Sequence, residues 1–254
     1  MEACGRDRVL ERVGVEPSGD AFNSIVFDER NNRPYNATVN AGALAATYLV
    51  EGVYTAEQAL ERLLDALRRY AGNRRLEVDE DTFEAEMRTA DLNRATAYLM
   101  RRDGMLGGDV ERILALYLRR CSVCATCQDL VVMAATLANG GVNPATGEHA
   151  LTTRYLRDVL SVMHTCGMYD FAGQWAYRIG IPAKSGVSGG IMAVVPGKLG
   201  IAVFSPGFDV YGNSLRGTAV CEEISERLGL HIFADNAEDE GHGGASGGGA
   251  SAGR

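Results

Sequence analysis

The sequence predicts an α+β domain in which a block of helices is followed by a β-hairpin and one closing helix. Helical spacing of apolar residues dominates the chain from residue 41 to residue 166. After residue 180 the pattern changes, because residues 190–195 and 199–204 are β-rich and flank a turn at residues 196–198. A lone hairpin is a marginal sheet, so we expect further strands to complete it.

The helical block divides at glycines and capping residues. Residues 41–49 are apolar on every side, which is typical of a buried helix. Residues 55–71 are amphipathic, with a capping box formed by Thr55 and Gln58 and a stop at Gly72. We expect the remaining helices at residues 81–102, 109–120, 126–139, 152–166 and 217–228, with weaker helical spacing in residues 1–14.

The chain divides into one folded domain and a polar tail. We place the domain at residues 1–233, with a weak candidate for a short strand at residues 23–27. From residue 234 the chain is acidic and then rich in Gly and Ser. Such a composition cannot bury much apolar surface, so we expect residues 234–254 to be disordered.

Composition and charge exclude several classes of protein. Apolar residues make up 46% and charged residues 23% of the 254, as in an ordinary globular protein. The formal charge of −8 argues against nucleic acid as a partner. No apolar run approaches the roughly twenty residues of a membrane span, and charges stand where a signal peptide would be apolar. We therefore expect a cytoplasmic protein with reduced thiols and no membrane partner.

Three of the six cysteines form a Cys-x-x-Cys-x-x-Cys pattern at Cys121, Cys124 and Cys127. A ferredoxin-type iron–sulfur run would place a fourth cysteine at the position of Val131, and no Cys or His follows at zinc-finger spacing. The pattern favours small thiols buried at a helix junction over a metal centre. We expect no metal and no cofactor.

Glu86 and Asn93 are seven residues apart in the expected helix 81–102, which would place them on one face with Ala90 and Ala97. Two interpretations are equally supported. The pair forms either a pocket wall in which Glu86 meets an ammonium group, or part of a solvated helix face.

Three further residues have side chains that could take part in catalysis. Lys184 begins a Lys-Ser-Gly triplet before the hairpin, which is either a basic residue in a glycine-rich loop or part of an active-site strand. Tyr117 and Tyr169 are either core rings or, where a nearby cation lowers the pKa, proton shuttles.

Longer sequence segments between residues 9 and 233, taken in chain order, resemble those of a single protein family. They include ERVGVEPSGD at 11–20, VNAGA at 39–43, DLVVMAATLANGG at 129–141, GMYD at 167–170, GIPAKSGVSGG at 180–190 and GNSLRG at 212–217. This resembles the bacterial and mitochondrial glutaminases of the serine β-lactamase-like superfamily.

The resemblance implies hydrolysis of L-glutamine to L-glutamate and ammonia through a glutamyl-enzyme. It implies a β-lactamase-like fold, of which this chain supplies the helical block and part of an antiparallel sheet. A homo-oligomer is possible, since family members commonly self-associate. The matching strings place substrate contacts at Asn40, Glu86, Asn93, Tyr117, Tyr169 and Val187, the last through its oxyanion-hole N–H, and catalytic roles at Tyr117 and Lys184.

The chain departs from the family at the nucleophile, which is the serine of a Ser-x-x-Lys motif. The only lysines are Lys184 and Lys198, and Ile181 and Val195 stand three residues before them. We therefore expect an N-terminally truncated glutaminase that lacks the N-terminal strands and the nucleophile helix and is inactive as written. The alternative is a catalytically dead glutaminase-like fragment that binds glutamine or a partner chain.

Overall fold

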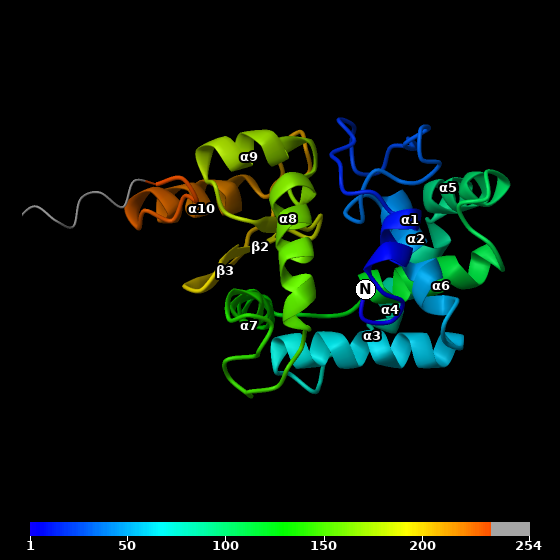
Figure 1. Cartoon of the computed structure of the whole chain (residues 1–254), viewed down its shortest axis with the longest axis horizontal. Coiled ribbons are helices and arrows are strands. Elements are labelled where there is room, and N and C mark those ends of the chain that lie inside the picture. Colours follow the sequence, from blue (N-terminus) through cyan, green and yellow to red (C-terminus); the bar gives the residue numbers. More distant parts are fainter. Residues whose placement is uncertain (235–254) are drawn as a thin grey trace, which may run out of the picture.

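The structure is a computed structural model, and it describes residues 1–234. A helical part and a sheet-containing part lie side by side, and the long helix α3 (Ala56–Ala71) contacts elements of both (Figure 1). The expected tail at residues 235–254 lies outside the described residues.

The helical part is built on α2 (Asn40–Glu51), α5 (Asp91–Arg102) and α6 (Val110–Cys121), with α1 (Arg6–Arg12) and α4 (Glu80–Arg88) packed around them. Its core is made of alanines on α2 and larger aliphatic side chains on α5 and α6. Leu44, Met100 and Ile113 are completely buried there. This packing fixes the start of α2 against α5 and α6, where the polar groups described below are found.

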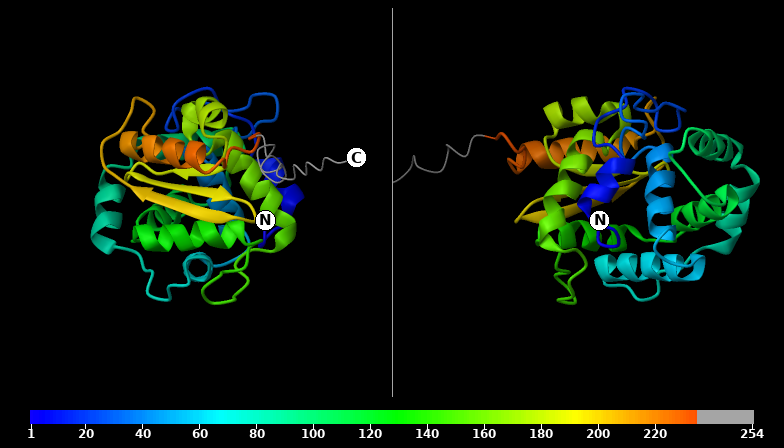
Figure 2. Two further views of the ribbon diagram at one scale, coloured as in Figure 1. Left: turned by 90° about the vertical axis from the view of Figure 1, so that its left-hand side faces the viewer. Right: turned by 45° about the vertical axis from the view of Figure 1, so that its right-hand side comes forward.

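The sheet has three antiparallel strands in the order β1 (Ala183–Ser185), β2 (Gly190–Val195) and β3 (Leu199–Phe204). It lies between α10 (Leu215–Arg227) on one face and α7 (Cys127–Ala138) on the other (Figure 2). Gly200 permits the close approach of α7, since a Cβ there would lie 2.3 Å from the backbone nitrogen of Ala135. Helices α8 (Leu156–Cys166) and α9 (Ala172–Arg178) complete this part.

Most of the expected elements are confirmed. The hairpin at residues 190–195 and 199–204 has the expected bounds, and β1 joins it as a third strand. The capping box of Thr55 and Gln58 is present, and Gly72 ends α3 with a φ of 64°. The helices expected at residues 41–49, 109–120, 126–139 and 217–228 correspond to α2, α6, α7 and α10, and a 3₁₀ turn (Thr153–Tyr155) precedes α8.

The single helix expected at residues 81–102 is wrong. The chain leaves helical geometry at Thr89 and Ala90, which separate α4 from α5. The Thr89 hydroxyl donates to the carbonyl of Ala85 at 3.2 Å, a side-chain bond that competes with the continuing helix. Glu86 and Asn93 therefore stand on different helices, and the argument from a shared helical face fails.

Two smaller expectations are also wrong. Residues 23–27 form no strand, and the surrounding loop has only isolated bridges such as that between Asp28 and Arg33. Cys121, Cys124 and Cys127 are exposed rather than buried, because the connection between α6 and α7 runs over the surface.

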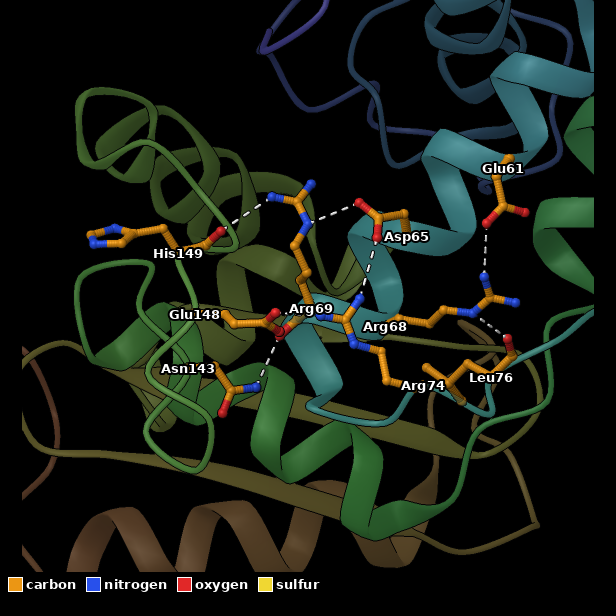
Figure 3. Close-up of polar contacts among 9 residues, drawn as sticks. All are labelled: Glu61, Asp65, Arg68, Arg69, Arg74, Leu76, Asn143, Glu148 and His149. Atoms are coloured by element: carbon orange, nitrogen blue, oxygen red, sulfur yellow. Dashed lines mark hydrogen bonds and ion pairs between the residues drawn. The ribbon is translucent and has the colours of Figure 1, made fainter.

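Ion pairs and hydrogen bonds tie the end of α3 to the loop that precedes α8 (Figure 3). The Asn143 amide donates to the carbonyl of Arg69 at 2.9 Å, and the Arg69 guanidinium pairs with Asp65 at 3.1 Å. Arg74 pairs with Glu148 of the loop. This network stabilises the end of α3 against the loop between α7 and α8. Within residues 1–234, every helix is too short or too polar to span a bilayer.

Gly180 and Gly197 form a matched test of the sheet-containing core. Both have left-handed backbones, with φ of 68° and 72°, but a Cβ on Gly180 would lie 2.2 Å from the His231 ring while Gly197 faces open space. We expect Gly197→Ala to lower the unfolding free energy by about 1 kcal/mol, and Gly180→Ala to lower it by about 3 kcal/mol or more. Urea unfolding followed by the fluorescence of Trp175, the only tryptophan, measures both. If the two variants lost the same unfolding free energy, the close contact between Gly180 and the His231 ring would be contradicted.

Candidate functional site

The side chain of Asn40 joins three helices. Asn40 is the first residue of α2, and its Nδ2 donates to Oδ1 of Asn93 on α5 at 2.9 Å. The Tyr117 hydroxyl on α6 donates to Oδ1 of Asn40 at 3.3 Å. The backbone N–H of Asn40 donates to the carbonyl of Phe22 at 3.0 Å. Asn40 thereby holds two other polar side chains, those of Asn93 and Tyr117, at the edge of the helical core.

Tyr169 and Lys184 form a second group on the sheet-containing part. The Tyr169 hydroxyl donates to the carbonyl of Ser185 at 3.0 Å, and Nζ of Lys184 lies 3.4 Å from that hydroxyl and donates to the same carbonyl. The ammonium also lies 4.5 Å from the centre of the Tyr169 ring. Tyr169 has a φ of 55°, a strained backbone for a residue with a side chain.

Phe22 connects the two groups. Its ring lies 4.8 Å from that of Tyr169, and its carbonyl accepts the Asn40 backbone bond. Asn40, Asn93 and Tyr117 are therefore next to Tyr169 and Lys184. The structure brings these five predicted residues together.

The β1–β2 loop presents a free peptide N–H at Val187. Hydrogen bonds from Gly186 N–H to Gly190 O (2.8 Å) and from Gly189 N–H to Gly186 O (2.9 Å) hold the turn. Val187 is 55% exposed, and its own N–H donates to no group within residues 1–234. Because this loop directly follows Lys184 and Ser185, the donor stands at the same edge of the sheet.

Glu86 is the least constrained of the predicted residues. It is exposed on α4, and no described side chain pairs with it. Its charge is nevertheless close enough to help raise the pKa of Tyr117. Glu86 therefore lies at the rim of the site as a carboxylate without a counter-ion.

Burial controls the protonation of the site. It raises the pKa of Tyr117, an effect that the nearby Arg120 opposes without overcoming, and it raises the pKa of Tyr169 to about 12. Burial and then the charge of Arg120 lower the pKa of Lys184 to about 8. The hydroxyl groups are thus donors at neutral pH, and Lys184 is the group that can exchange a proton near neutrality.

Three neighbours of the site were missed in the sequence. Arg120 and Cys121 follow Tyr117 by three and four residues on α6, a spacing that places them beside it. The Arg120 guanidinium lies 5.1 Å from the centre of the Tyr117 ring. Phe22 gave no signal, since its contacts with Asn40 and Tyr169 depend on how an irregular loop folds.

These groups could bind a small molecule that carries both a positive and a negative charge. The site combines amide and phenol groups, a half-buried lysine and an exposed carboxylate, and a peptide N–H of the kind that can stabilise an oxyanion is free at Val187. Within residues 1–234 no three His, Cys, Asp or Glu side chains are grouped so that they could hold a metal ion.

Comparison with known proteins identifies the family. The Glutaminase family model matches residues 1–233. A glutaminase of Trichormus variabilis is 58% identical over 233 residues, which are 92% of this chain and 69% of that protein. Glutaminase 2 of Clostridium perfringens is 47% identical over 90% of this chain and 75% of its own.

Solved structures agree with this comparison. A probable glutaminase of Bacillus subtilis superposes with a TM-score of 0.85 at 38% identity, covering 90% of this chain and 77% of that one. The protein Mglu, in its tris and glutamate form, superposes with a TM-score of 0.86 at 42% identity. The chain covers 52% of the Mglu chain, so it spans about half of that protein.

The fold is therefore the β-lactamase-like α+β fold of these neighbours. The chain belongs to the glutaminase family.

Replacement of Lys184 tests the burial of the site lysine. A folded-state pKa of about 8, below the usual 10.5, means that the charged form destabilises the fold at neutral pH. We expect Lys184→Met to raise the unfolding free energy by about 2 kcal/mol at pH 7. The gain should shrink as the pH rises from 8 toward 10.5, because the wild-type lysine then loses its proton in the folded state first. Lys198→Met, in the exposed hairpin turn, is the control, and a pH-independent effect of Lys184→Met would contradict the assignment.

Proposed function

We propose that this chain forms the amino-acid-binding part of a glutaminase, with L-glutamine as its substrate. The reaction is hydrolysis of the side-chain amide to L-glutamate and ammonia. The observation that carries this proposal is the contact of Asn40 with both Asn93 and Tyr117, next to Lys184 and Tyr169, in a chain of the glutaminase family.

Opposite charges at the two ends of the site would orient the amino acid. Glu86 would pair with the α-ammonium group, since it is a carboxylate without another partner. Asn40 accepts from Tyr117 and donates to Asn93, which leaves the Asn93 NH₂ free to donate to the α-carboxylate. Tyr117 and Tyr169 would border the aliphatic part of the substrate.

The reacting amide would lie toward the sheet edge. A serine hydroxyl of a Ser-x-x-Lys motif would form a bond to the amide carbon, and the carbon–nitrogen bond would break as the nitrogen leaves as ammonia. The Val187 N–H would stabilise the oxyanion, and Lys184 and Tyr117 would carry protons. Water would then release glutamate from the serine ester. The 254 residues contain no Ser-x-x-Lys, so the chain as printed supplies the pocket without the nucleophile.

Several further expectations belong to this proposal. The glutaminase unit comprises residues 1–233, the range that the family model matches. We also propose that the protein is cytoplasmic, binds no cofactor, nucleic acid or membrane, and self-associates as a homo-oligomer.

A second candidate function is binding without hydrolysis. The lack of Ser-x-x-Lys in the printed sequence favours a protein that holds glutamine, or a partner chain, without consuming it. The two functions differ in whether a supplied nucleophile restores turnover.

We expect the purified 254-residue chain to release no ammonia from L-glutamine above the uncatalysed rate. Fusing to its N-terminus the Ser-x-x-Lys segment of a family member should restore turnover, and the same fusion with that serine changed to alanine should not. Coupled glutamate dehydrogenase reports ammonia directly. Turnover by the chain alone would overturn the missing-nucleophile account, and an inactive but folded fusion would favour the second candidate.

Removing the charge of Glu86 should weaken glutamine binding about tenfold, since a partly solvated ion pair with the ammonium group is lost. Titration calorimetry of Glu86→Gln measures this. Glu84→Gln is the matched control, because Glu84 lies on the same helix and pairs with Arg88 at 3.8 Å. Equal behaviour of the two variants would exclude Glu86 from the site.

A further inference from the structure

Two buried polar side chains beside the candidate site each have an oxygen without a hydrogen-bond partner. Ser185, on β1, is 1% exposed, and nothing within residues 1–234 bonds to its Oγ. Asn213, in the loop before α10, is completely buried, and its Oδ1 is equally without a partner in that part of the chain. Burying such an atom without a hydrogen bond is unfavourable, so each oxygen indicates a bonding group that shares the interior with it.

One short stretch of backbone holds both residues. The backbone N–H of Ser185 donates to the carbonyl of Gly167 at 3.0 Å. The amide Nδ2 of Asn213 donates to the carbonyl of the next residue, Met168, at 3.4 Å. Both side chains are therefore anchored to successive residues of the segment that leads into Tyr169.

Both residues also lie on the face of the sheet that α10 covers. Ser185 pairs with Ile191 of β2, and side chains that are opposite each other in an antiparallel pair point to the same face. A Cβ on Gly217, in the first turn of α10, would lie 3.1 Å from Cδ1 of Ile191. Asn213 directly precedes Ser214, whose side chain caps this helix. The two oxygens without partners therefore lie between β1 and the start of α10.

A water molecule can satisfy both oxygens. The Ser185 hydroxyl does not bond to the Asn213 amide directly. An amide oxygen only accepts hydrogen bonds, whereas a hydroxyl can donate or accept. A water between them could accept from Ser185 and donate to Asn213, and buried waters in proteins typically bridge two to four such groups.

Ser185 is also the residue on which the sheet part of the candidate site is fixed. Its carbonyl accepts from the Tyr169 hydroxyl at 3.0 Å and from Nζ of Lys184. Val187, with its free N–H, follows two residues later in the chain. A displacement of Ser185 would therefore move three groups of the site together.

We propose that Ser185 is a positioning residue whose hydroxyl is held to Asn213 by one buried water molecule, so that its carbonyl keeps Tyr169 and Lys184 in place. The hydroxyl acts through the backbone of β1 and does not contact the substrate. The role in the reaction rests on the proposed function, whereas the water site does not.

Thermal unfolding of the 254-residue chain tests the shared water. We expect Ser185→Ala to lower the melting temperature by about 3 °C, as for the loss of one hydrogen bond. A hydroxyl without any partner would give the opposite sign, because its removal relieves an unfavourable burial. Asn213→Ala should also lower the melting temperature. The double variant should melt close to Asn213→Ala alone, because the two side chains share one water.

Lysine NMR supplies a readout that a merely structural role would not move. The chain has only two lysines, so ¹³C-lysine labelling gives two Cε signals, which Lys198→Arg assigns. The Ser185 carbonyl stabilises the Lys184 ammonium group, so Ser185→Ala should lower the pKa of Lys184 further below its value of about 8. Ser185→Thr, which keeps the hydroxyl, should restore it.

Ser225 is the matched control for both measurements. It is a buried serine of α10, and its hydroxyl donates directly to the carbonyl of Ile179 at 2.6 Å. Ser225→Ala should lower the melting temperature and leave the pKa of Lys184 unchanged.

A crystal structure of the unsubstituted chain locates the water directly. We expect one ordered water within about 3.2 Å of both Ser185 Oγ and Asn213 Oδ1. A direct bond between the two side chains, a higher melting temperature of Ser185→Ala, or additive losses in the double variant would overturn the shared water. An unchanged Lys184 pKa in Ser185→Ala would overturn the positioning role. These measurements use no substrate, so they decide the inference separately from the proposed function, which fails if the chain binds no L-glutamine.

Discussion

The site depends on the side-chain amide of one asparagine at the start of a buried helix. Asn40 donates to Asn93 and accepts from Tyr117, while its backbone N–H is bonded to Phe22. Each hydrogen bond contributes only about 1 kcal/mol. The two side-chain bonds, however, join α2 to α5 and to α6 through one residue, and the alanine-rich face of α2 lets those helices approach closely enough for the bonds to form.

The sheet part adds Lys184 and Tyr169 to the site. Lys184 is placed by a short edge strand, and Tyr169 is held against it by a strained left-handed backbone, a bond to Ser185 and contact with the Phe22 ring. Phe22 therefore contacts residues of both groups of the site. Among residues 1–234, Lys184 and the exposed Glu86 are charged groups of the site that form no ion pair.

The sequence predicted the regular elements well, because their signals are local. The hairpin, the capping box of Thr55 and the buried helix after Asn40 all follow from periodicity and end signals over a few residues. The break at Thr89 was missed, since no glycine or proline marks it. Strand β1 was one of two alternatives for the Lys184 triplet, because three residues carry too little pattern to decide, and the strand forms through pairing with β2.

The candidate site was predicted through resemblance rather than through spacing. The spacing argument for Glu86 and Asn93 rested on a helix that does not continue, although Asn93 does contact Asn40. A pKa of Tyr117 lowered by a nearby cation was one of two alternatives. Burial outweighs Arg120 and raises the pKa of Tyr117, whereas burial lowers the pKa of Lys184. Such balances depend on burial, which a single sequence does not reveal.

A crystal structure of the 254-residue chain with L-glutamate tests the central claim most directly. The account predicts the α-ammonium group within hydrogen-bond distance of Glu86, the α-carboxylate on Asn93, and the side-chain carboxylate near Lys184 and the Val187 N–H. A ligand bound elsewhere, or bound in the opposite direction, would contradict it.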